Sequence, residues 1–429
     1  MRILGLDIGG ANIKGAVVIS KGARARLKSQ FSLPFELFRD KAALADKLAF
    51  LRKKIKPEMV ALTMTGELCD NFSNRSAGAK WILGCAQKSF AGLAIKVVDN
   101  KGELTTMSQA RRQPMAVASA NWAATARWVA ANGLRHGVVI DIGSTTTDIL
   151  PIKDGAPACR GVDDFSRARE GELVYTGYLR THAAMVAHEI TIQGRKMDSC
   201  PEYFAIMGDA HLLSGEMGPR EYTCATPDGG PKTKQGAARR LCRIVMADLE
   251  QLGMESGKEI ADQIVAAQTN RLERALAGII QRTGLDNSAS ILAIGAGAGV
   301  YGKMIQSRFA MKVLAGLAGV VAKSINPAFC TAMLAHGSAG LHQSSPEPTD
   351  WRVYLLSCAD GTYYCGATND IDRRMERHNR GIGSRYTRSR LPVSLVATSR
   401  GMTRGEALSL EAMVKKEKRQ EKAAVINNY

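Results

Sequence analysis

The sequence predicts an α/β protein followed by a smaller second part, and three observations support this. Strand-like and helix-like segments alternate over about the first 346 residues. A strand, an Asp-Ile-Gly sequence, a polar turn and another strand occur twice there, at Asp7 and again at Asp141. Residues 342–350 are polar and contain two prolines, which is typical of a linker. We therefore place a domain boundary near residue 347 of the 429.

The elements of the first part follow from hydrophobic periodicity. Short apolar runs predict strands at 3–7, 15–19, 59–65, 95–99, 138–142, 148–152 and 291–294. Apolar residues at helical spacing predict helices over 118–131, 236–252 and 257–282. This order of elements favours sheets that are covered by helices.

Composition excludes several classes of protein. Hydrophobic residues make up 45% of the chain and charged residues 23%, so disordered, collagen-like and disulfide-miniprotein classes do not fit. No run of 18 apolar residues occurs and the first residues do not read as a signal peptide, so we expect no membrane partner. The nine cysteines form no CxxC pair, which favours free thiols and a cytoplasmic location.

The two Asp-Ile-Gly hairpins carry the residue types of a phosphate and metal site. An aspartate at the end of a buried strand, here Asp7 and Asp141, can hold a hydrated divalent cation such as Mg²⁺. Glycines after it let backbone N–H groups approach phosphate oxygens closely. The candidate phosphate-binding residues are Gly9, Gly10, Asn12, Lys14, Gly143, Ser144, Thr145 and Thr146. Two such hairpins facing each other would clamp a chain of phosphates, whereas the alternative is a pair of turns without a ligand.

A third element, residues 290–300, is a strand that ends in spaced glycines. Gly295 and Gly297 suit contact with an adenosine or a similar flat group. In this order the three elements resemble the phosphate-1, phosphate-2 and adenosine motifs of the actin, sugar kinase and hsp70 superfamily. The resemblance implies two RNase H-like lobes, at about 1–117 and 118–343, with a central cleft, and it makes ATP a candidate ligand of that cleft.

Stretches between these motifs are similar to the hydantoinase A/oxoprolinase branch, and within it to proteins of tetrahydromethanopterin-linked one-carbon transfer and methanofuran biosynthesis. They lie at 63–70, 171–177, 201–209, 226–230 and 238–241. The resemblance covers residues 1–343. It implies a transferase that joins a furanmethyl diphosphate to a γ-glutamyltyramine-type phenol, forming an ether and releasing diphosphate. Glu67, Glu172 and Asp209 are the candidates for the base that takes the phenol proton.

The segment after the linker, placed at 344–350, carries a second set of chemical groups within 351–429. They are Tyr354 and Tyr364 on a predicted hairpin, Arg374 and His378 on a helix, and Glu411 on a later helix. Over residues 351–424 this set resembles the small bacterial GIY-YIG endonuclease domains. The resemblance implies a small α+β domain.

The same resemblance implies roles for these residues. The two tyrosines would orient the water nucleophile, Arg374 would neutralise the scissile phosphate, and Glu411 would hold one Mg²⁺. His378 would assist proton transfer or bind phosphate. The formal net charge is +18, and seven arginines lie between residues 373 and 390, which favours DNA or RNA as the partner. Arg385, Arg388 and Arg390 would hold the nucleic-acid backbone.

Three functions stay open at this point. The first is the transferase with a nuclease-like module. The second is an ATP-dependent hydantoinase or oxoprolinase-type hydrolase that uses the same cleft, and the third is a non-catalytic nucleotide-binding scaffold. For the second part, cutting nucleic acid and binding it without cutting stay open, as does the oligomeric state.

Overall fold

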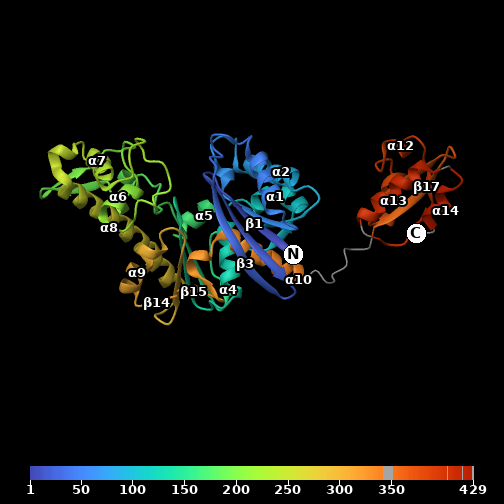
Figure 1. The fold of residues 1–429 in the computed structure, drawn as a ribbon. Coiled ribbons are helices and arrows are strands. Elements are labelled where there is room, and N and C mark those ends of the chain that lie inside the picture. The colour runs from blue at the N-terminus through green and yellow to red at the C-terminus, as the bar shows by residue number, and fades with distance from the viewer. Residues whose placement is uncertain (342–350, 403, 418, 428–429) are drawn as a thin grey trace. The chain divides into compact units, whose positions relative to one another are not determined.

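The computed structural model describes residues 1–341, 351–402, 404–417 and 419–427. Contacts within the chain divide it into two units, Met1–Gly340 and Leu341–Tyr429 (Figure 1). The linker expected at 344–350 lies outside the described residues.

The first lobe of the larger unit is built on a six-stranded sheet in the order β3-β2-β1-β4-β5-β6. β1 pairs antiparallel with β2 and parallel with β4, which pairs parallel with β5. Residues of β1 alternate between the two faces, so Leu4, Leu6 and Ile8 pack against helices α1 and α2. The elements are β1 (Arg2–Ile8), β2 (Asn12–Lys21), β3 (Arg24–Pro34), α1 (Leu44–Ile55), β4 (Met59–Met64), η1 (Gly66–Leu68), α2 (Arg75–Ser89), β5 (Ala94–Val98), β6 (Leu104–Thr106), α3 (Met107–Arg112) and η2 (Pro114–Ala116).

The second lobe repeats this arrangement in the order β10-β8-β7-β13-β14, with β9 beside β8. β7 pairs antiparallel with β8 and parallel with β13, as β1 does with β2 and β4. The elements that form and flank this sheet are α4 (Asn121–Ala131), β7 (Gly137–Ile142), β8 (Thr147–Lys153), β9 (Ala156–Pro157), α5 (Asp164–Arg169), β10 (Leu173–Val174), β13 (Ser290–Ile294), α9 (Ala298–Phe309), β14 (Lys312–Val313), β15 (Gly316–Leu317), β16 (Val320–Val321), η4 (Ala322–Ser324) and α10 (Pro327–Leu341).

Helices α4 and α10 join the two lobes. One apolar core contains residues of both sheets together with Trp128 of α4 and Phe329 of α10, whose ring centroids are 5.0 Å apart. α10 lies so close to β1 that a Cβ at Gly5 would be 2.0 Å from the Ala328 carbonyl oxygen. The predicted class, two RNase H-like lobes of the actin and sugar-kinase type, is confirmed by this topology.

A helical insertion between β10 and β13 extends the second lobe (Figure 1). The helix predicted at 236–252 is wrong as a single element. α7 ends at Ile244, Met246 has a φ of 56°, and Gly253, inside the segment assigned to α8, has a φ of 80°. The helix predicted at 257–282 is confirmed. The insertion comprises η3 (Ala183–Met185), β11 (Glu189–Ile192), β12 (Arg195–Asp198), α6 (Met207–Ser214), α7 (Lys234–Ile244) and α8 (Leu249–Thr283).

The smaller unit is an α+β domain around a three-stranded antiparallel sheet, β18-β17-β19. Val353 and Leu355 of β17 pack with α13 and α14 on one face, and Tyr354 and Leu356 pack with α11 on the other. The elements are β17 (Arg352–Cys358), β18 (Tyr363–Thr368), α11 (Ile371–Asn379), α12 (Arg385–Arg388), β19 (Val393–Thr398), α13 (Arg404–Lys416) and α14 (Lys422–Asn427). Among the described helices of either unit, none is long and apolar enough to cross a membrane.

Candidate functional site

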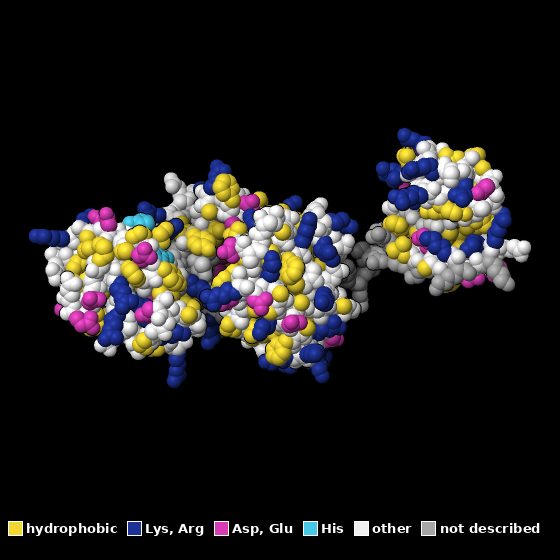
Figure 2. Space-filling model, turned by 90° about the horizontal axis from the view of Figure 1, so that it is seen from above, with side chains coloured by type: hydrophobic (Ala, Val, Ile, Leu, Met, Phe, Trp, Pro, Cys, Tyr) yellow, Lys and Arg dark blue, Asp and Glu magenta, His cyan; other side chains and the backbone are white. Residues whose placement is uncertain are grey.

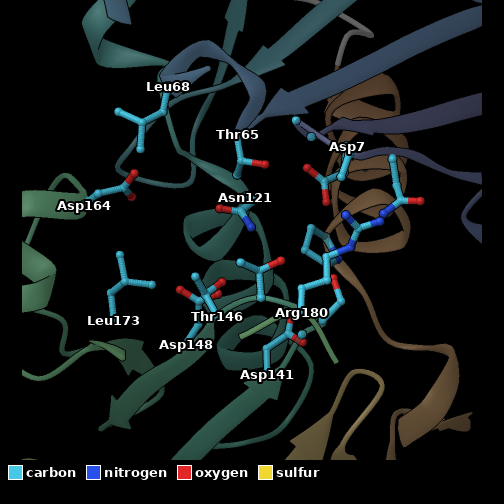
Figure 3. A pocket seen from close by; sticks show the side chains of 18 of the residues that line it. Asp7, Thr65, Leu68, Asn121, Asp141, Thr146, Asp148, Asp164, Leu173 and Arg180 are labelled. Atoms are coloured by element: carbon cyan, nitrogen blue, oxygen red, sulfur yellow. The ribbon is translucent and has the colours of Figure 1, made fainter. Parts of the chain in front are cut away.

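The two Asp-Ile-Gly hairpins line one pocket of about 460 Å³ between the lobes of the larger unit (Figure 3). All eight candidate phosphate-binding residues of the hairpins, and both candidate metal ligands, are among its lining residues. The structure therefore brings together two segments that lie 134 positions apart in the sequence.

The turns of the two hairpins have the same backbone hydrogen bond. The Gly9 N–H donates to the Asn12 carbonyl at 3.0 Å, and the Gly143 N–H donates to the Thr146 carbonyl at 2.9 Å. In the described part of the chain, the backbone N–H groups of Gly10 and Ser144 have no protein acceptor. Such N–H groups at the tip of a turn can bind an anion, so each turn offers donors to a phosphate.

In each lobe, the segment after the edge strand that pairs with the hairpin donates a hydrogen bond to a carbonyl group of the turn; these edge strands are β3 and β10. In the first lobe, the Leu37 N–H donates to the Gly10 carbonyl at 2.8 Å. In the second lobe, the Arg180 N–H donates to the Ser144 carbonyl at 2.8 Å. This second contact places Arg180 at the pocket, where its side chain is a further cation (Figure 3).

The carboxylates of Asp7 and Asp141 enter this pocket from the central strands of opposite lobes. Burial raises the pKa of Asp7, although Lys14 lowers it. Burial also raises the pKa of Asp141 to about 7; Lys14 opposes this effect, and Asp148 and Asp7 add to it. The Asp7 Oδ1 atom is buried and has no hydrogen-bond partner. A divalent cation would relieve this excess of negative charge.

The donor set fits Mg²⁺ in a particular way. Within the described residues, no three His, Cys, Asp or Glu side chains are grouped closely enough to hold a metal by themselves. Mg²⁺ commonly binds one or two carboxylates and completes its shell with water and substrate phosphate oxygens. Asp7 and Asp141 are therefore suited to hold the ion together with a bound phosphate.

Four charged residues of the pocket were missed by the sequence analysis: Asp148, Asp164, Arg167 and Arg180. Arg167 Nη1 lies 2.8 Å from Asp148 Oδ1, and the guanidinium lies 4.5 Å from the centre of the Trp122 ring. Asp148 directly follows the Ser-Thr run and could have been noted for that reason. No sequence signal connects it to Arg167, which comes from α5.

The pocket has two chemically different ends (Figure 3). Asp7, Asp141 and Arg180 lie at one end, and Leu68, Leu173 and the carboxylate of Asp164 lie at the other. The first end suits a phosphate group and a cation. The second offers two leucine side chains beside the Asp164 carboxylate, and the paired charges of Asp148 and Arg167 lie next to Leu173, so this end suits a less polar group that carries a polar substituent.

The third glycine motif packs against the second hairpin, next to Asp141. Gly295 and Gly297 are not among the lining residues of this pocket. A Cβ at Gly295, whose φ is 86°, would lie 2.5 Å from Asp141 Oδ1, and one at Gly297 would lie 2.5 Å from Ile142. These glycines allow the close packing of the chain after β13 against the second hairpin.

The three candidate bases do not line the pocket. Glu172 is buried, and its carboxylate accepts from the N–H groups of Arg160 and Gly161 and pairs with Arg282. Asp209 is buried and pairs with Arg240 at 2.7 Å. Both carboxylates are therefore fully engaged in holding the fold.

Glu67 differs from the other two candidates. It is buried, precedes the pocket-lining residue Leu68 in the chain, and its Oε1 lies 2.5 Å from Ser119 Oγ. The Ser119 hydroxyl also contacts Asp164, which does line the pocket. Glu67 therefore connects to the pocket through one intermediate side chain.

The smaller unit gathers Tyr354, Arg374 and His378 into one network. Arg374 Nε donates to the Tyr354 hydroxyl at 2.9 Å, which lies 3.1 Å from His378 Nε2. His378 Nδ1 lies 2.8 Å from Thr387 Oγ1. Burial raises the pKa of Tyr354 to about 12, and burial with nearby arginines lowers the pKa of His378 to about 4. Both groups are therefore neutral near pH 7, and the hydrogen bond between the Tyr354 hydroxyl and His378 Nε2 joins two uncharged groups.

Two glycines make room for this network. A Cβ at Gly366 would lie 2.5 Å from the Tyr354 hydroxyl, and a Cβ at Gly383 would lie 2.6 Å from the His378 ring. Gly366 is the last residue of the Tyr-Cys-Gly sequence that begins at Tyr364. A larger residue at this position would clash with Tyr354, which explains the glycine of the motif.

Tyr364 and Glu411 flank the network. The Tyr364 ring is half-buried, and its centre lies 5.1 Å from that of His378. Glu411 on α13 pairs with Lys415 at 2.6 Å, and its charge contributes to the raised pKa of Tyr354. It therefore lies within electrostatic range of the tyrosine.

The basic residues of this unit are mostly at its surface. Figure 2 shows Lys and Arg side chains over the visible face, with fewer Asp and Glu. Arg385 and Arg388 are exposed. Arg390 is partly engaged, because it pairs with Asp360 at 2.8 Å and lies over the Tyr386 ring.

Comparisons with known proteins find one family for the larger unit and another for the smaller unit. The family model described as Hydantoinase/oxoprolinase matches residues 58–331, and the model described as GIY-YIG catalytic domain matches residues 350–424. Over 250 residues the chain is 34% identical to "(4-{4-[2-(gamma-L-glutamylamino)ethyl]phenoxymethyl}furan-2-yl)methanamine synthase" of Methanocaldococcus jannaschii, covering 58% of this chain and 73% of the relative. A protein of the same name from Methanococcus vannielii is 32% identical over 162 residues, 38% of this chain and 72% of that relative.

The second part has relatives of its own. A UPF0213 protein of Nitratidesulfovibrio vulgaris is 49% identical over 76 residues, which are 18% of this chain and 69% of the relative. A solved UPF0213 protein of Bacillus halodurans is 42% identical and covers 18% of this chain and 81% of that chain, with a TM-score of 0.13.

A nucleotide-free acetone carboxylase structure covers 92% of this chain and 87% of its own, with 10% identity and a TM-score of 0.47. Both resemblances drawn from the sequence are confirmed.

Proposed function

We propose, on the premise that this chain belongs to the hydantoinase/oxoprolinase family, that its larger unit joins a furanmethyl diphosphate to a γ-glutamyltyramine-type phenol. The two synthase relatives support this, because the product in their name contains a phenoxymethylfuran, which is an ether of a phenol and a furanmethyl group. The reaction forms that C–O bond and breaks the bond between the furanmethyl carbon and diphosphate. The electron pair of the broken bond leaves with diphosphate.

The observation that carries the proposal is the pocket shared by the two hairpins. Turn N–H groups, Lys14 and Arg180 would bind the departing diphosphate and stabilise its developing charge. Mg²⁺ held by Asp7 and Asp141 would add Lewis-acid stabilisation of the same charge. The apolar end with Leu68 and Leu173 would receive the aromatic acceptor, so both substrates would meet within one pocket.

Hydrolysis driven by ATP is the second candidate for this cleft. It needs room for an adenosine group beside the phosphates. The glycines expected to make that contact, Gly295 and Gly297, pack against the second hairpin and do not line the pocket. The synthase relatives, whose name describes an ether product, favour a substrate diphosphate over ATP.

The experiment combines the purified full chain with Mg²⁺, an aminomethyl-furanmethyl diphosphate and γ-glutamyltyramine. We expect ether formation, with diphosphate released only when both substrates are present. Asp141→Asn should lose this activity, and Asp262→Asn, an exposed carboxylate on α8, should keep it. ATP turnover by the wild type without ether formation would overturn the proposal.

For the smaller unit, a GIY-YIG-type domain, we propose Mg²⁺-dependent cleavage of DNA or RNA. Tyr364, the more exposed tyrosine, would orient the water nucleophile, and Arg374 would face the scissile phosphate. Mg²⁺ held by Glu411 would polarise that phosphate. The neutral Tyr354 and His378 would hold the Arg374 guanidinium in place through the hydrogen bond at Nε.

This second activity is tested by incubating the full chain with plasmid DNA and with structured RNA, with and without Mg²⁺. We expect Mg²⁺-dependent nicking that Glu411→Ala abolishes and the exposed control Glu421→Ala retains. Equal background from the wild type and Glu411→Ala would contradict cleavage and leave binding as the role of the domain.

A further inference from the structure

One buried hydroxyl, that of Ser119, links three charged side chains behind the apolar end of the pocket. Its Oγ lies 2.5 Å from Glu67 Oε1 and 2.9 Å from Asp164 Oδ2, and Arg75 Nη2 donates to it at 3.0 Å. Glu67 and Arg75 belong to the first lobe, Asp164 begins α5 of the second, and Ser119 lies in the segment that connects the lobes.

The number of protons in this cluster is limited. Arg75 already donates to Ser119 Oγ, and the hydroxyl has a single proton of its own. It can donate to Glu67 or to Asp164, but not to both. Because both carboxyl groups lie at hydrogen-bond distance from Oγ, the second contact is favourable only when one of the two is protonated and donates to Ser119.

Burial indicates which carboxyl group holds that proton. The Glu67 side chain is fully buried, and its Oε2 atom has no hydrogen-bond partner. The Asp164 side chain is 28% exposed and lines the pocket. Because a buried charge without full hydrogen bonding is costly, Glu67 suits the neutral acid and Asp164 the anion.

The charged groups around Asp164 agree with this assignment. Burial raises the pKa of Asp164, while the Ser119 hydrogen bond, Arg75 and Arg167 lower it and Asp148 raises it further. Burial is also the largest cause of the raised pKa of Glu67. Asp164 is thus a carboxylate of increased basicity at the surface of the pocket.

Ser119 also has an unusual backbone. Its φ of 49° is in the left-handed region, which is rare for residues other than glycine, Asn and Asp. Strained residues of this kind cluster at functional sites, where surrounding structure holds them in place. In this conformation the Ser119 hydroxyl lies between the two carboxyl groups.

We propose that Asp164 is the catalytic base that takes the proton of the acceptor phenol, and that Glu67 and Ser119 are its positioning residues. The inference rests on the proposed transferase function. Asp164 lies with Leu68 and Leu173 at the apolar end of the pocket, away from Asp7 and Asp141 (Figure 3). The phenol proton moves to the Asp164 carboxylate, the phenolate oxygen bonds to the furanmethyl carbon, and diphosphate leaves with the electron pair.

The test compares two acceptors in Asp164→Asn and in the wild type. With γ-glutamyltyramine, loss of a general base should slow ether formation by about 10²-fold or more. With an analogue whose ring is polyfluorinated, the phenol is already ionised at the assay pH and needs no base. The loss should then shrink to a few-fold. An equal loss with both acceptors would mean that Asp164 is structural and would overturn the inference.

Glu67→Gln separates the two carboxyl groups. An amide can donate to Ser119 as the protonated acid does, so this variant should retain most of the rate and the preference between acceptors. The assignment would be overturned if Glu67→Gln lost much activity with γ-glutamyltyramine and little with the fluorinated acceptor. Glu67 would then be the base.

A pH profile supplies an independent readout. In the wild type, the rate with γ-glutamyltyramine should fall as pH falls through the raised pKa of Asp164, and this acid limb should vanish in Asp164→Asn. A wild type that forms no ether with either acceptor would instead refute the proposed function itself, so the two failures are distinguishable.

Discussion

The two Asp-Ile-Gly hairpins have the same backbone but opposite charges at one matched position. Asp7 pairs across the first hairpin with Lys14, and Asp141 pairs across the second with Asp148. The first hairpin therefore presents an acid beside a base, and the second presents two acids. The Asp148 charge is compensated by Arg167 from outside the hairpin.

The difference indicates that the two copies of the hairpin have different chemical roles. Lys14 is suited to contact an anion directly, whereas Asp141 keeps an excess of negative charge that attracts a cation. The repeat of the fold supplies two equivalent turns, and one substitution at the matched position makes their chemistry complementary. Each prediction below tests this comparison, from the largest expected effect to the smallest.

Both strand aspartates are expected to be required. Asp7→Asn and Asp141→Asn should each lower the rate of diphosphate release by about 10³-fold, because each removes a carboxylate that holds the cation. The double variant should be little worse than either single one, since the pair acts as a unit. Initial rates with Asp262→Asn as the control check this. Full activity of either single variant would mean that the hairpins do not act together.

The matched pair Lys14 and Asp148 should respond in different ways. Lys14→Met should lower activity by about 10²-fold with little change in stability, because it removes a donor to the leaving group. Asp148→Asn should lower the free energy of unfolding by about 3–5 kcal/mol, because it leaves buried Arg167 without its partner. Urea titrations and initial rates of both variants measure these two effects. If both variants lost the same property, activity or stability, the different roles of Lys14 and Asp148 would be refuted.

The metal-free protein should lose stability as pH rises from about 4 to 7. The folded state keeps a proton on Asp141 up to about pH 7, and the unfolded chain releases it near pH 4. The folded state binds more protons in this window, so its stability falls with pH by up to about 1.4 kcal/mol per unit. Urea titrations with chelator at pH 5, 6 and 7 measure the slope. Asp141→Asn should reduce this slope, most of all between pH 6 and 7; an unchanged slope would assign it to other groups.

Single polar donors of the turns should have the smallest effects. Ser144→Ala and Asn12→Ala should each weaken diphosphate binding by about 0.5–1.5 kcal/mol, the usual contribution of one hydrogen bond. Equal losses would indicate that both turns contact the anion. A loss confined to Ser144→Ala would indicate that only the second turn does so.

The sequence was sufficient for those features that local patterns encode. The strands, the two turns and their shared pocket were predicted because each hairpin is a continuous segment with its own glycines and aspartate. Tyr354, Arg374 and His378 were predicted to belong to one set and do form one network.

Features that depend on distant partners were not predictable. Glu172 was a plausible base until Arg282, 110 residues away, was found beside its carboxylate. Asp164 was overlooked because its connection to Glu67 passes through Ser119, and no local spacing relates these three residues. The break of the helix near Ile244 was missed because the apolar spacing continues through it.

The central claim is that both hairpins hold one diphosphate, and calorimetric titration of the full chain with inorganic diphosphate tests it most directly. With Mg²⁺ present, we predict one diphosphate bound per chain and loss of that binding in Asp7→Asn as well as in Asp141→Asn. Binding that persists in either variant, or two independent sites, would contradict the claim.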